Sequence, residues 1–145
     1  MVPSPQPEVV VLNIGREASF RELRHQLLVD AGFTVFSVET VNEAEAAINR
    51  KTPQVMVVGA WVPRADRDQV VKMVKVRNPR ATVIFYYDQN IDGAEQADAI
   101  LNFRGDHSDL VRTLQHLLSR SASKAFRHLA AIATSVGSTW IACCF

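Results

Sequence analysis

Residues 53–63 read Pro-Gln-Val-Met-Val-Val-Gly-Ala-Trp-Val-Pro, and the apolar run Val55 to Val58 at their centre decides the fold. Four residues are too few for a helix, and valine is typical of strands. Because the run does not alternate with polar residues, we expect a strand buried on both faces, as in a parallel sheet covered by helices. Gly59 directly follows this strand.

Four further short apolar runs lie on either side of this one, separated by segments of helical period. They are Val9 to Leu12, Phe33 to Val38, Thr82 to Tyr87 and Ala99 to Leu101. Strands that alternate with helices are typical of α/β folds with a parallel sheet. The sequence therefore predicts an α/β domain with five strands.

Helix signals fill the intervals between these runs. Apolar residues from Phe20 to Ala31 share one helical face, Ser19 and Glu22 form a capping-box pair, and Gly32 closes the segment. The remaining predicted helices follow the pairs Thr40 with Glu43 and Asp106 with Asp109, or span Asp66 to Val76 and Asn90 to Gln96.

The composition is that of a globular protein, with 48% apolar and 21% charged residues. Three of the 16 basic residues and none of the 15 acidic residues lie beyond Leu118, so the formal charge is −2 over residues 1–118 and +3 over residues 119–145. We expect a domain over residues 1–118, then a linker and an amphipathic or apolar helical tail. The domain lacks the basic field that nucleic-acid binding uses, so no nucleic acid is expected.

The tail carries one apolar helical face, which consists of Phe126, Leu129, Ile132, Ala133, Val136 and Trp140. This face could pack on its own domain, on a twin subunit, on a partner or on a membrane surface. Cys143 and Cys144 are adjacent at the end of the chain and cannot form a disulfide framework, and neither a leader nor a membrane-spanning stretch is found. The expected location is cytoplasmic.

Ligands of open α/β sheets bind beyond the carboxyl ends of the strands. The residues expected at that edge are Asn13, Ile14, Gly59, Tyr87 and Phe103. They include no carboxylate pair and no nucleophile, and no glycine-rich phosphate loop follows the first run. Asp88, Asp92 and Asp98 are interpreted as caps and solvated surface. We therefore expect no enzyme activity, no metal and no cofactor.

Several local strings occur in an order that resembles the receiver domain of two-component response regulators, across Glu8 to Leu118. They are Leu27-Leu28 to Ala31-Gly32-Phe33, Pro53 to Pro63, Asn78-Pro79 before Val83-Ile84, and Ala97-Asp98 before the fifth strand. The resemblance implies a flavodoxin-like, doubly wound five-stranded parallel sheet in the order 2-1-3-4-5.

The resemblance also implies a phosphorylation site, which this sequence does not reproduce. Receivers use an acceptor Asp after the third strand, an acidic pair that holds Mg²⁺, a hydroxyl after the fourth strand and a Lys after the fifth. Those positions carry, in that order, Gly59, Asn13 with Ile14, Tyr87, and Phe103. Moving the acidic pair by one residue still yields no acidic pair. The sequence predicts a stand-alone pseudo-receiver that binds another protein.

By the same resemblance, the partner surface comprises the fourth helix, fifth strand and fifth helix. The surface residues predicted there are Ile91, Ile100, Arg104 and Leu110. The expected partner is a signalling kinase or regulator, or a second copy of the chain. The alternatives are a flavodoxin-like domain that binds a small ligand at the carboxyl edge and a membrane-peripheral adaptor that uses the tail.

Aromatic residues gather near the predicted carboxyl edge. Trp61, Tyr86, Tyr87 and Phe103 follow three different strands or end them. They could form a partner-binding hot spot or fill the pocket left by the missing acidic residues. For Phe103 the second interpretation is favoured.

Overall fold

The computed structural model describes residues 8–89 and 91–120 of the chain. The chain divides into two compact units, residues 1–113 and 114–145, and every strand belongs to the first. The predicted domain end at Leu118 and the predicted tail over residues 119–145 stay predictions. The apolar face of that tail and both cysteines lie outside the described residues.

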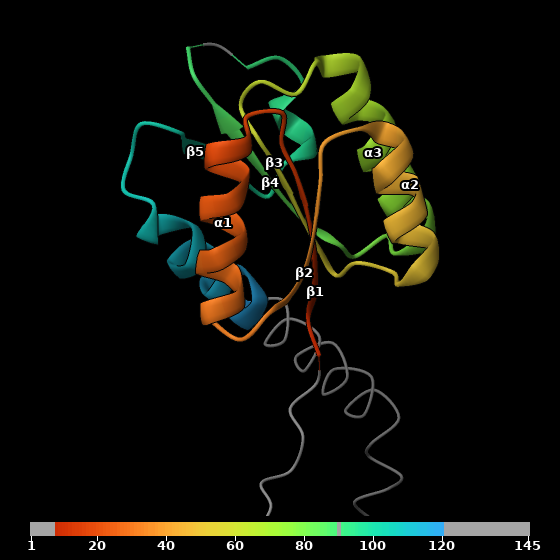
Figure 1. Cartoon of the computed structure of the whole chain (residues 1–145), viewed down its shortest axis with the longest axis horizontal. Coiled ribbons are helices and arrows are strands. Elements are labelled where there is room, and N and C mark those ends of the chain that lie inside the picture. Colours follow the sequence, from red (N-terminus) through yellow and green to blue (C-terminus); the bar gives the residue numbers. More distant parts are fainter. Residues whose placement is uncertain (1–7, 90, 121–145) are drawn as a thin grey trace, which may run out of the picture. The chain divides into compact units, whose positions relative to one another are not determined.

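Five parallel strands form one sheet in the order β2-β1-β3-β4-β5, which confirms the predicted fold class and strand order. The strands are β1 (Val10–Ile14), β2 (Thr34–Val38), β3 (Val55–Val58), β4 (Thr82–Tyr87) and β5 (Ala99–Asn102). Figure 1 shows α1 (Ala18–Asp30) on one side of the sheet, and α2 (Val41–Arg50) and α3 (Arg64–Arg77) on the other. The fold is a doubly wound sheet.

Strand β3 is buried on both faces, as its continuous apolar sequence predicts. Val55, Met56, Val57 and Val58 are each at most 1% exposed. Met56 and Val58 belong to the main core, together with Phe85 of β4 and residues of α2 and α3. Parallel pairing on both sides, with β1 and β4, satisfies the backbone of this central strand.

Helix α2 is capped as the sequence predicts. The backbone N–H of Glu43 donates to Thr40 Oγ1 at 3.1 Å, and the Thr40 hydroxyl donates to the Glu43 carboxylate at 3.2 Å. The capping box predicted for Ser19 and Glu22 is wrong. Helix α1 begins at Ala18, its N-cap is Glu17, and no side chain caps it.

The helix predicted from Asn90 to Gln96 is reduced to one 3₁₀ turn, η1 (Ala94–Gln96). Gly93, which precedes this turn, has a φ of +74°, a left-handed conformation that a continuous α-helix does not accommodate. Asn90 itself lies outside the described residues. This side of the molecule therefore presents a loop between β4 and β5.

Residues 108–120 are helical, and the Asp106 carboxylate accepts a hydrogen bond from the Ser108 N–H at 3.0 Å. Asp106 therefore caps the start of this helix, whereas Asp109 lies inside it and pairs with Arg112 at 3.3 Å.

In the part of the chain that the structure describes, no helix combines the length and apolar character needed to cross a bilayer.

Candidate functional site

Gly15 and Gly59 lie side by side at the carboxyl edge of the sheet. The Gly59 N–H donates to the Ile14 carbonyl at 2.8 Å, and the Gly15 N–H donates to the Val38 carbonyl at 3.1 Å. A Cβ built on Gly59 would lie 3.3 Å from Gly15 Cα. The ends of β1 and β3 thus meet at two residues without side chains.

Asn13 and Ile14 are the last two residues of β1 and do not follow it, so the first strand extends two residues beyond its predicted end at Leu12. Ile14 pairs with Val38 and Val58 and is 1% exposed in the core. The strand extends over a polar residue because the buried side chain of Asn13 is fully hydrogen-bonded. The residues that follow β1 are Gly15 and Arg16, and these also form no acidic pair.

The amide of Asn13 joins β1 to β2 and α1. Its Nδ2 donates to Ser37 Oγ at 2.9 Å and to the Arg21 carbonyl at 3.0 Å, while its Oδ1 accepts from Arg24 Nε at 2.9 Å. Ser37 Oγ is in turn 2.7 Å from His25 Nδ1. A buried polar network with satisfied partners fixes its members in place, and here it fixes the side chain of Arg24.

Arg24 is a buried residue at this edge that the sequence interpretation missed. It is only 6% exposed, and its guanidinium lies beside both glycines. A Cβ on Gly59 would be 3.0 Å from Arg24 Nη2, and one on Gly15 would overlap the same atom. The guanidinium also lies over the Tyr86 ring, 5.4 Å from its centroid. The space at the edge of β1 and β3 is therefore filled by a cation.

The charge of Arg24 is not balanced by a carboxylate among residues 8–89 and 91–120, where the ion pairs involve other residues. Burial lowers the pKa of Arg24 to about 10, and repulsion from Arg21 acts in the same direction. The side chain remains protonated at neutral pH. Burial also raises the pKa of Tyr86 to about 12, so its phenol is neutral beneath the guanidinium.

One signal in the sequence could have identified Arg24. It lies four residues after Phe20 and four before Leu28, on the apolar face of α1. A charged residue on the buried stripe of an amphipathic helix needs a partner inside the domain. Arg24 and Leu28 are the buried residues of α1.

Four aromatic rings form a cluster at the same edge: Phe20, Trp61, Phe103 and His107. The Phe103 ring lies 4.7 Å from Trp61 and 5.7 Å from Phe20, both edge to face. Phe20 also lies 5.5 Å from Trp61 and 6.3 Å from His107. Trp61 is 42% exposed, so the cluster fills space beside the edge and also presents an aromatic surface to solvent.

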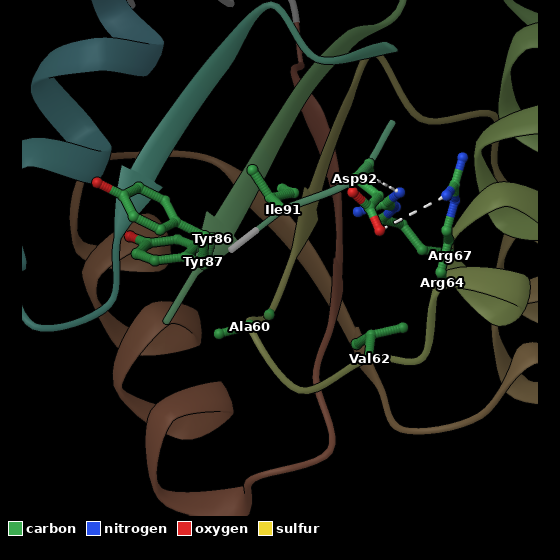
Figure 2. A pocket seen from close by; sticks show the side chains of 9 residues that line it. Ala60, Val62, Arg64, Arg67, Tyr86, Tyr87, Ile91 and Asp92 are labelled. Atoms are coloured by element: carbon green, nitrogen blue, oxygen red, sulfur yellow. Dashed lines mark hydrogen bonds and ion pairs between the residues drawn. The ribbon is translucent and has the colours of Figure 1, made fainter. Parts of the chain in front are cut away.

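A cavity of about 200 Å³ opens between the β3–α3 loop and the β4–η1 loop. Figure 2 shows Tyr86 and Tyr87 at one end of it and Arg64, Arg67 and Asp92 at the other. Arg67 is 7% exposed, lies 4.6 Å from the centroid of Phe85, and donates to the Asp92 carbonyl. Gly59 contributes to the wall of this cavity.

The aspartates Asp88, Asp92 and Asp98 do not gather into a metal site, and Asp98 lies at the opposite edge of the sheet, where β4 and β5 begin. Asp98 accepts from the Val83 N–H at 2.8 Å, Asp88 lies 3.5 Å from Arg104, and Asp92 lies 3.8 Å from Arg64. Over the described residues, no three His, Cys, Asp or Glu side chains are grouped closely enough to hold a metal ion. Each carboxylate serves a backbone or arginine partner.

Solved structures with the same fold include receiver domains and proteins that contain them. The signal receiver domain of a LuxO repressor protein from Vibrio parahaemolyticus has a TM-score of 0.69 and 19% identity, over 83% of this chain and 97% of that chain. The chemotaxis protein CheY4 of Vibrio cholerae has a TM-score of 0.66 and 20% identity, over 77% and 99%. NtrX from Brucella abortus has a TM-score of 0.73 and 21% identity, over 84% and 30%. No protein-family model and no curated protein matches the sequence.

The chain has the receiver-domain fold. In this receiver fold, the position directly after β3 is Gly59, as the sequence predicts. Tyr87 is the last residue of β4, and Phe103 follows β5, with its N–H bonded to the Tyr87 carbonyl at 3.1 Å. The three positions predicted to correspond to the receiver site at the ends of β3, β4 and β5 thus carry a glycine and two aromatic residues, and the Arg24 guanidinium lies beside Gly59.

The predicted partner surface of the receiver fold needs one correction. Leu110 is 0% exposed, so its side chain is not available to a partner. Ile100 is 38% exposed on β5, and the exposed Arg104 lies in the following loop. Ile91 is half-buried, packs against the core and lines the cavity.

Proposed function

We propose that this protein is a pseudo-receiver, which acts in signal transduction by binding another protein without being phosphorylated. The observation that carries the proposal is Gly59 at the acceptor position, with the Arg24 guanidinium packed against it. A fold supports many functions, and function must be argued from the site. This site retains the receiver scaffold and none of the groups that transfer a phosphoryl group.

Two physical reasons argue against phosphoryl transfer at this edge. Glycine offers no nucleophile, since the acceptor of a receiver is a side-chain carboxylate. Magnesium requires oxygen ligands and gives up its water reluctantly, whereas the residues after β1 are Gly15 and Arg16. The buried charge of Arg24 would repel a divalent cation at the same place. By this argument the site lacks both the acceptor carboxylate and the magnesium ligands of a receiver.

The surface proposed for the partner lies on β5 and the loop that follows it. Ile100 presents an exposed apolar side chain there, and Arg104 a cation held 3.5 Å from Asp88. Trp61 and Phe103 add an aromatic surface nearby. Aromatic and arginine side chains dominate the energetics of protein interfaces. The proposed partner is a signalling kinase or regulator, or a second copy of the chain.

The interaction surface can be tested by capture of the partner from cells with the full-length chain. We expect Ile100→Lys to reduce the captured amount about tenfold, because it places a charge at the centre of an apolar contact. Val76→Lys is the matched control, since Val76 is an exposed apolar residue (74%) on α3. The control is expected to capture as much partner as the parent chain.

Treatment of the captured complex with a small-molecule phosphodonor and Mg²⁺ distinguishes a pseudo-receiver from a receiver. The proposal requires that the amount of bound partner stays the same. A phosphodonor-dependent gain or loss of partner, traced to this chain, would refute phosphorylation-independent binding. Equal capture by Ile100→Lys and the parent chain would refute the assigned surface.

A further inference from the structure

An excess of positive charge is concentrated at the start of α1. Arg21 and Arg24 both reach Gly15: Arg21 Nη1 donates to the Gly15 carbonyl at 2.7 Å, and Arg24 Nη2 occupies the space where a Gly15 side chain would be. Neither forms an ion pair within the described part of the chain. The other arginines of this edge do, for example Arg16 with Asp66 at 2.9 Å.

The burial of Arg24 makes its uncompensated charge unusual. The residue is 6% exposed and therefore 94% buried. Burying a charge costs free energy unless the charge is paired and hydrogen-bonded. Its only hydrogen bond to a described residue is from Nε to Asn13 Oδ1. The donors on both Nη atoms therefore lack a protein acceptor in this part of the chain.

Those donors still reach the surface of the edge. Among the described residues, Asp88 Oδ1 is fully buried and has no hydrogen-bond partner, and no side-chain atom of Arg24 is in the same situation. The Nη groups thus have access to solvent while the rest of the side chain is enclosed. A fixed guanidinium with free donors is suited to bind oxygen anions in a bidentate manner.

The N-terminus of α1 adds to the same positive potential. This helix has 13 residues and no acidic residue in its first turn, and its N-cap residue, Glu17, forms no side-chain cap bond. The N-terminal N–H groups of such a helix favour anions, in addition to the two guanidinium groups. Gly15 and Gly59 keep the backbone open beside Arg24, because a side chain at either position would crowd it.

We propose that this edge is an oxyanion site, formed by Gly15, Arg21, Arg24 and Gly59, which binds a phosphate or carboxylate group without forming a covalent bond. The place where the receiver fold is expected to hold a metal cation thus holds an anion in this protein. The anion neutralises the charge of Arg24 and bridges it to Arg21. The inference does not depend on the partner surface proposed above.

Titration of the full-length chain with inorganic phosphate, at constant ionic strength set by sodium chloride, tests the site. A parallel titration with acetate distinguishes a free phosphate from a carboxylate, such as an acidic side chain of a partner. We expect saturable binding of at least one of the two anions by calorimetry. The backbone amide signals of Gly15 and Gly59 are expected to shift in NMR spectra at the same concentrations.

Two variants locate the binding energy. Arg21→Ala removes a half-buried guanidinium that takes no part in the hydrogen bonds between Asn13 and other side chains. Arg24→Lys keeps the positive charge but loses the planar guanidinium. Each is expected to weaken binding by about tenfold or more, the effect of losing a charge-assisted hydrogen bond. Arg80→Ala, an exposed residue before β4 at the opposite edge, should bind as the parent chain does.

Two results would overturn the oxyanion site. One is the absence of saturable binding of both anions to the parent chain. The other is binding that Arg21→Ala and Arg24→Lys leave unchanged, which would place the anion elsewhere. The intact mass of the chain should stay constant in phosphate, which distinguishes reversible binding from phosphorylation. If no anion binds at this site, the pseudo-receiver proposal still stands.

Discussion

Arg24→Ala is expected to lower the free energy of unfolding by about 2–3 kcal/mol, although Arg24 is a charged residue. The substitution removes a side chain that is 94% buried and packs on Tyr86. It also leaves Asn13 Oδ1, buried at 0% exposure, without the donor it has in the folded protein. Relief of the unpaired charge offsets part of this loss.

Urea unfolding of the full-length chain measures this effect, and two further variants interpret it. Arg24→Met restores most of the volume without the hydrogen bond, so its stability should lie between those of Arg24→Ala and the parent chain. Arg80→Ala changes an exposed arginine and should alter the free energy of unfolding by less than about 0.5 kcal/mol. If Arg24→Ala is as stable as Arg80→Ala, Arg24 does not hold the edge together.

Gly15→Val is expected to destabilise the fold by about 2 kcal/mol or more, as overpacking of a filled site does. Even the Cβ of the new residue would overlap Arg24 Nη2, and the guanidinium would have to leave its position between the strand ends. The backbone of Gly15 is not the cause, because among the described residues only Gly32 and Gly93 have a positive φ.

A double-mutant cycle isolates the steric cause. In the Arg24→Ala background the obstacle is gone, so Gly15→Val should cost at least about 1 kcal/mol less than in the parent chain. Thermal or urea unfolding of the four proteins provides the comparison. Additive effects of the two substitutions would mean that Gly15 is required for a reason other than the space that Arg24 occupies.

The fold could be predicted because its signals are local and repeated. The run from Val55 to Val58 indicates a strand that is buried on both faces, and Thr40 with Glu43 indicates the start of a helix. The predictions for these segments are confirmed. The capping pair Ser19 with Glu22 failed because α1 starts before it, with Glu17 at the N-cap.

The site could be predicted only in what it lacks. Gly59 follows β3, and no side chain is needed to see that the acceptor is missing. Its position on the apolar face of α1 indicates that Arg24 is buried, but no local motif indicates its contact with the ends of β1 and β3. The sequence predicts that Asn13 follows the first strand, because the apolar run ends at Leu12. Its three hydrogen bonds to partners distant in sequence explain why β1 continues past it.

The most direct test of the central claim is the intact mass of the full-length chain after incubation with acetyl phosphate and Mg²⁺. The account predicts no added phosphoryl group on the parent chain, and none on Gly59→Asp, because the new carboxylate would lie against the Arg24 guanidinium with no metal ligands beside it. A phosphoryl group on the carboxylate introduced by Gly59→Asp would show that the missing acceptor is the only reason why the site is not phosphorylated, and that Arg24 does not contribute. A phosphorylated carboxylate on the parent chain would contradict the account as a whole.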